Sequence, residues 1–354
     1  MIPPGRADRA RENNFGFLRL LFAVLVLVSH APELADGDRS REILTRIFGT
    51  LSFGEAAVDG FFLISGYLIT MSFAYSRSTA SYFYRRLARI VPAYAVCFWL
   101  CVFALAPFVG AQLSPGAVGH QCLWFLCLSQ PFLAGAFQGL HYPFLNGSLW
   151  TIPYEFRCYL AVPLLGYLGL LEPRRRFWFL ALVALLLALN VAQNLYRLFP
   201  APGSNLAVLG EIVFGTPEKN IRFFAVFGVG ALFHLFREDL RLTNQGALAA
   251  AALLLGLFFN RIVAETALAL LGGYLVFWAA FSVPVLRASR LDNGVDISYG
   301  LYLYAWPVAN LFLWWDRAVD PWLLCLLSLL GAGLLAVASW IFIEKPALDL
   351  VRKL

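Results

Sequence analysis

The chain has 354 residues, of which 60% are hydrophobic and only 14% are charged. Soluble chains are about 45–50% apolar and about 25% charged, so this composition excludes a water-soluble protein. The formal net charge is +6, which in a membrane protein is first a signal of topology and does not by itself indicate nucleic-acid binding.

The apolar stretches are continuous rather than alternating, which predicts helices and not the strands of an outer-membrane barrel. The expected fold class is therefore all-α: a polytopic integral membrane helical bundle with about ten transmembrane helices and one membrane domain over residues 1–354. Segments of about 20 residues can span the hydrocarbon core. In chain order they are 15–31, 52–74, 90–109, 147–170, 177–196, 221–236, 246–259, 262–284, 297–315 and 322–343.

The region 121–139 is also apolar, and an eleventh span there would reverse the orientation of everything after it. Lys and Arg decide against that reading, because with ten spans 17 of them lie in cytoplasmic segments and 7 in outer segments. The positive-inside rule then predicts that both termini lie in the cytoplasm. The expected location of the protein is the inner (plasma) membrane. We expect 121–139 to dip into the membrane or to pack across the bundle, covered by protein.

No metal and no nucleic-acid partner are expected, and membrane lipids are the surroundings. The four His residues are scattered, and the six Cys residues lie in or beside apolar segments without paired spacing.

Arg19 and His30 lie in the first span. Eleven helical steps bring them to within roughly 20° of one face, about 16 Å apart along the axis. Ionisable groups inside spans usually face a cavity or the bundle interior. The pair therefore indicates two points on the wall of one cavity, although Arg19 as a snorkelling anchor and His30 as an interface residue remain alternatives.

Asp59 lies in the second span, before the run Phe61–Thr70, at a depth similar to that of His30. A carboxylate there can hold a histidine tautomer, as in hydrolase triads, or can cap the start of the helix. The following Ser65-Gly66 pair is typical of close helix packing and less typical of a nucleophile.

Arg85, Arg86 and Arg89 precede the third span, and Arg85 and Arg89 are one helical turn apart. This spacing suits a clamp on phosphate oxygens, or it is the ordinary basic flank of a span.

Glu155 follows Ser148 by seven residues near the outer end of the fourth span. A buried Glu is protonated, paired with an arginine or catalytic.

The chain resembles the membrane acyltransferase-3 family in the stand-alone form, without the hydrolase-like domain that some members append. The resemblance covers nearly the whole chain and rests on six motifs in order. They are Arg19-x10-His30, the run from Asp59 to Thr70, the run from Tyr84 to Pro92, Ser148-Leu149-Trp150 with Glu155, the run from Ser298 to Tyr304, and Glu344-Lys345-Pro346. One departure is Ala305-Trp306-Pro307, where many members have a second His, so no second histidine role is expected.

The resemblance implies a transmembrane O-acyltransferase that uses an acyl-CoA donor, typically acetyl-CoA, and a carbohydrate or glycan acceptor at the cell surface. Arg19, Arg85, Arg86 and Arg89 would bind the donor, His30 would act as general base or as acyl-carrying nucleophile, and Asp59 and Glu155 would assist it. The rival hypotheses are a polytopic transporter or flippase for a glycan or small solute, and an idle membrane scaffold.

Overall fold

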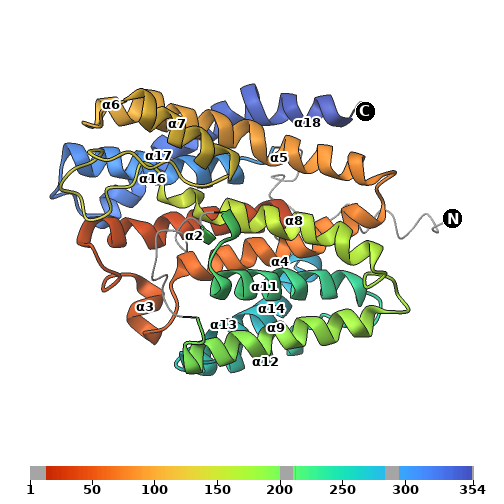
Figure 1. Cartoon of the computed structure of the whole chain (residues 1–354). Coiled ribbons are helices and arrows are strands. Elements are labelled where there is room, and N and C mark those ends of the chain that lie inside the picture. Colours follow the sequence, from red (N-terminus) through yellow and green to blue (C-terminus); the bar gives the residue numbers. More distant parts are fainter. Residues whose placement is uncertain (1–12, 200–209, 212, 284–294, 353–354) are drawn as a thin grey trace.

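The computed structural model describes residues 13–199, 210–211, 213–283 and 295–352, and within them it contains helices and no strand. Figure 1 shows these helices lying side by side in a layered bundle. The all-helical class predicted from the sequence is confirmed.

Most of the helices overlap the segments that hydropathy predicted as spans, whereas α3, α7 and α18 lie outside them. In chain order they are α2 (Phe15–Asp36), α3 (Ile43–Phe48), α4 (Phe53–Ala74), α5 (Thr79–Leu100), α6 (Ala106–Phe108), α7 (Pro115–Leu126), α8 (Ile152–Tyr167), α9 (Arg176–Tyr196), α11 (Pro217–Leu235), α12 (Asn244–Leu257), α13 (Ala264–Ala267), α14 (Gly273–Ser282), α16 (Ser298–Trp315), α17 (Pro321–Ser339) and α18 (Lys345–Arg352). A 3-10 turn at Gly147–Thr151 leads into α8, and π-helical segments Cys101–Leu105, Leu268–Gly272 and Trp340–Glu344 join neighbouring helices into longer rods.

Six of these helices or rods are long and apolar enough to cross a membrane, which makes the protein a multi-pass membrane protein. They are Phe15–Asp36, Phe53–Ala74, Thr79–Phe108, Arg176–Tyr196, Ala264–Ser282 and Pro321–Arg352. The number ten stays a prediction. α16 lies outside this set although most of its residues are buried, because its Tyr, Trp and Asn side chains lower its hydropathy.

The connections between the helices gather at two ends of the bundle. Figure 1 shows α3 and the region of α6 and α7 at the left, whereas the turn between α4 and α5 and the turn between α8 and α9 lie at the right. Successive long helices therefore run in opposite directions through the bundle.

The apolar region 121–139 begins within α7, which has 12 residues and is about 18 Å long, too short for a core of about 30 Å. Phe125 stacks on Tyr94 of α5 with ring centroids 5.5 Å apart. The Gln121 side-chain amide donates to the Phe132 carbonyl at 2.7 Å and accepts from its N–H at 3.2 Å. This segment thus packs on α5 and does not cross as one helix.

α4 and α11 cross at van der Waals contact of their backbones. A Cβ on Gly66 would lie 2.0 Å from the Phe227 carbonyl oxygen, and one on Gly230 would lie 2.0 Å from the Leu63 carbonyl oxygen. Only glycine permits this approach, which is common where helices pack in membranes. The prediction that Ser65-Gly66 marks a packing site is confirmed for Gly66, and the crossing fixes which face of α4 points away from α11.

Candidate active site

A cavity of about 440 Å³ lies between α2, α4, α5, α8, α16 and the rod Pro321–Arg352, which contains α17 and α18. Each element contributes the residues of one helical face, spaced three or four apart, as Phe61, Ser65 and Leu68 of α4 illustrate. The cavity therefore results from six packed elements that lie far apart in the sequence.

All four arginines predicted to bind a donor line this cavity. Arg19 comes from α2, and Arg85, Arg86 and Arg89 come from α5, which begins before them at Thr79. Sequence reasoning missed a fifth lining arginine, Arg352 near the end of α18. Two carboxylates, Glu155 and Asp296, also line the cavity, which leaves an excess of three positive charges among the lining residues.

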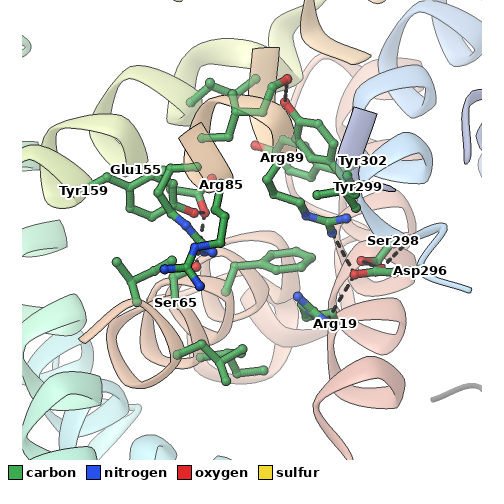
Figure 2. Close-up of a pocket in the computed structure, with 18 of the residues that line it drawn as sticks. Arg19, Ser65, Arg85, Arg89, Glu155, Tyr159, Asp296, Ser298, Tyr299 and Tyr302 are labelled. Carbon is green, nitrogen blue, oxygen red and sulfur yellow. Dashed lines mark hydrogen bonds and ion pairs between the residues drawn. The ribbon is translucent and has the colours of Figure 1, made fainter. Parts of the chain in front are cut away.

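Asp296 connects two of these arginines and was also missed. Its Oδ2 lies 3.2 Å from Arg19 Nη2 and 2.7 Å from Arg89 Nη2, and Ser298 Oγ donates to its Oδ1 at 2.5 Å. Figure 2 shows this cluster on one side of the cavity, with Arg85 and Glu155 on the other. The available signal was a carboxylate two residues before the buried helix that starts at Ser298.

Arg89 is further neutralised by Glu344, whose Oε2 lies 3.6 Å from Arg89 Nη1. By contrast, neither Arg85 nor Arg86 forms an ion pair with any residue that the structure describes. Arg85 donates to Ser76 Oγ at 2.5 Å and to a backbone carbonyl, and Arg86 Nε is buried without a hydrogen-bond partner. These two guanidinium groups are free to bind an anionic ligand.

Glu155 lies in the first turn of α8 and accepts hydrogen bonds from the hydroxyls of Ser65, at 3.1 Å, and Tyr159. Both donors line the cavity with it, as Figure 2 shows. Glu155 therefore pairs with hydroxyl donors and not with an arginine, which was one of the possibilities left open by its sequence position. The Glu155 side chain lines the cavity.

His30 lines a separate hollow of about 10 Å³, with Trp306 and Ser328 among its other walls. Its Nδ1 lies 3.1 Å from Glu33 Oε2. Among the described residues, this hollow and the large cavity share no lining residue. Arg19 and His30 therefore lie along one helix but open into different spaces.

Aromatic rings of α2, α4 and α16 pack together beside the large cavity. Phe61 and Tyr302 line the large cavity with ring centroids 6.0 Å apart, and Phe22, on α2 between Arg19 and His30, packs 5.7 Å from Phe61.

Asp59 is fully buried, and the structure pairs it with Arg222 of α11, at 3.1 Å, rather than with His30. Arg222 also pairs with Glu265 at 2.9 Å. Asp59 meets Arg222 because it lies seven residues, about two helical turns, before Gly66. Both residues are therefore on the face of α4 that packs on α11. Glu33, three residues after His30, takes the place that the sequence analysis gave to Asp59.

Within the described residues, no group of three or more His, Cys, Asp or Glu side chains could hold a metal ion. The cavity chemistry instead consists of guanidinium groups, hydroxyls and carboxylates.

These features define a polytopic helical membrane protein with a basic internal cavity and a histidine beyond it. The chain belongs to the acyltransferase-3 family: the family model described as "Acyltransferase domain" matches residues 12–344. It is therefore an enzyme of the acyltransferase class, as the motifs predicted.

Curated relatives agree with this assignment. The chain is 29% identical to "Nodulation protein 10" of Rhizobium leguminosarum bv. viciae, over 99% of this chain and 97% of the relative. It is 28% identical to an "O-acetyl transferase" of Shigella phage Sf6, over 95% and 96%. It is also 28% identical to "Acyltransferase MdmB" of Streptomyces mycarofaciens, over 46% and 41%. The comparison with solved structures gives no match.

Proposed function

We propose that this membrane acyltransferase moves an acyl group, acetyl by preference, from cytosolic acyl-CoA to a hydroxyl of a cell-surface glycan or related molecule. The observation that carries the proposal is the cavity, where arginines outnumber carboxylates and two of the arginines have no carboxylate partner among the residues that the structure describes. Coenzyme A carries three phosphate groups, and guanidinium is the side chain best suited to bind them.

Arg85 and Arg86 bind donor phosphates in this proposal, while Arg19 and Arg89 are held by Asp296 along the path of the pantetheine arm. The arm would extend past Phe61 towards His30, over the roughly 16 Å that eleven helical residues span. The expected cytoplasmic position of both termini agrees with this direction, because α4 and α5 meet on the side where α18 ends (Figure 1).

The reaction exchanges one acyl bond for another. The acceptor oxygen bonds to the thioester carbonyl carbon, the carbon–sulfur bond breaks, and the hydroxyl proton passes through His30 to the departing thiolate. Alternatively, His30 takes the acyl group first and then passes it to the acceptor, with the same products. Glu155 lines the donor cavity and would position the thioester or carry a proton there, whereas Asp59, paired with Arg222, would support the fold around His30.

The acetyl group and the hydroxyl acceptor are proposed by analogy, since the Shigella phage protein is named an O-acetyl transferase, whereas the glycan acceptor is proposed from the family resemblance. The proposal places the enzyme in the inner (plasma) membrane, with the acceptor approaching from the outer side.

The test is transfer of labelled acetyl from acetyl-CoA by purified protein in proteoliposomes, against a panel of glycans. We expect labelled glycan ester with the wild type and only residual labelling with His30→Ala. Equal labelling by both proteins, or a solute that crosses the bilayer without acyl transfer, would overturn the proposal.

A further inference from the structure

His30 is engaged at one ring nitrogen. Its Nδ1 lies 3.1 Å from Oε2 of Glu33, one turn later on α2. An ionised carboxylate only accepts hydrogen bonds, so Nδ1 carries the hydrogen of this contact. In the neutral ring, Nε2 then holds the lone pair.

Glu33 is itself fixed in place. α2 ends at Gly37, whose φ of 80° is a left-handed conformation that suits glycine and turns the chain back. The turn brings Arg39 Nε to 3.1 Å from Glu33 Oε1, while Arg39 Nη1 lies 3.3 Å from Glu55 Oε2. Glu55 is anchored in turn by the N–H of Ser52 at the start of α4, at 2.8 Å.

The ring of His30 also packs against apolar residues. The Trp306 ring meets His30 edge to face with centroids 5.1 Å apart, and the other lining residues of the hollow are mostly apolar. Glu33 is only 8% exposed, so the contact between carboxylate and imidazole is shielded from water and is stronger than a surface pair.

We propose that Glu33 is the positioning residue of His30. Glu33 fixes the Nδ1–H tautomer, leaves Nε2 to react and stabilises the imidazolium that forms, while Arg39, braced by Glu55, holds the Glu33 carboxylate in register. The inference rests on the proposed function for its chemistry: Nε2 takes the acceptor proton as the ester bond forms, and returns it to the thiolate as the carbon–sulfur bond breaks.

The kinetic test is a double-mutant cycle of acetyl transfer. We expect Glu33→Ala to lower kcat about 100-fold, and Glu33→Gln, which keeps an acceptor oxygen without the charge, to lower it less. The donor KM should stay within about twofold, since the donor site is elsewhere. In the His30→Ala background, Glu33→Ala should cause no further loss. Arg39→Gln should lower kcat about tenfold.

Asp36→Asn is the matched control, because Asp36 forms an ion pair with Arg41 at the same end of α2 without touching His30. The inference is overturned if Glu33→Ala behaves like Asp36→Asn, or if its effect multiplies with that of His30→Ala, as expected of a purely structural residue.

A second measurement does not depend on activity. In ¹⁵N solid-state NMR of histidine-labelled protein, the signal lost in His30→Ala identifies His30. The inference predicts the Nδ1–H tautomer in the wild type and a shift towards Nε2–H in Glu33→Ala. An Nε2–H tautomer in the wild type contradicts the inference. If these spectra agree with the inference while no acyl donor is consumed, the proposed function fails and the positioning contact stands.

Discussion

Replacing Arg86 by Gln is expected to weaken binding of acyl-CoA without unfolding the protein. Arg86 lines the cavity, forms no ion pair within the described part of the chain, and has a buried Nε without a partner. Hydrogen bonds to charged groups contribute about 1.5–3 kcal/mol. At about 1.4 kcal/mol per factor of ten, the donor KM should rise about 10- to 150-fold.

A truncated donor separates phosphate binding from other effects. S-acetylpantetheine lacks the phosphates, so its KM should be the same for Arg86→Gln and wild type. Arg89→Gln is the contrasting variant, because it removes the arginine that pairs with the buried Glu344 and one of the two arginines that pair with Asp296. That variant should lower the free energy of unfolding by about 3–5 kcal/mol. An unchanged acetyl-CoA KM in Arg86→Gln, or an equal rise with both donors, would refute the reasoning.

Three further predictions concern the path and the scaffold. Phe61→Trp enlarges a ring that lines the cavity and should lower kcat for acetyl transfer about tenfold, whereas an unchanged kcat would contradict a role of Phe61 along the path. Gly66→Ala places a Cβ against a backbone carbonyl of α11 and should lower the free energy of unfolding by about 1–3 kcal/mol, measured by thermal unfolding in detergent. Arg222→Leu removes the arginine partner of Asp59 and Glu265 and should lower the free energy of unfolding by about 3–5 kcal/mol in the same assay. A decrease below about 1 kcal/mol would contradict the buried pairing.

Hydropathy and residue spacing along the chain indicated most of the helices and the arginines that line the cavity. Hydropathy located the helical segments, because each needs an apolar stretch within one part of the chain. The turn spacing of Arg85 and Arg89 predicted a common face, and α5 places both in the cavity wall. Arg19 lines the same cavity, whereas the expectation that Arg19 and His30 share one cavity is not met, because the two residues line separate spaces.

Partners across helices could not be predicted in the same way. Depth in the membrane made Asp59 a candidate for His30, but the rotation of α4 about its axis is set by the crossing at Gly66, which turns Asp59 towards Arg222. Asp296 meets Arg19 and Arg89 only through the packing of α16 against α2 and α5. Glu33 was within reach of sequence reasoning, since it lies one turn from His30 on the same helix.

The most direct test of the account is the sidedness of acetyl transfer in sealed membrane vesicles of known orientation. Acetyl-CoA supplied on the cytoplasmic face should label an acceptor enclosed on the opposite side, and both His30→Ala and Arg86→Gln should reduce this transfer. Labelling only of acceptors on the same face as acetyl-CoA, or transfer that is independent of His30, would contradict a path from the arginine-lined cavity to His30.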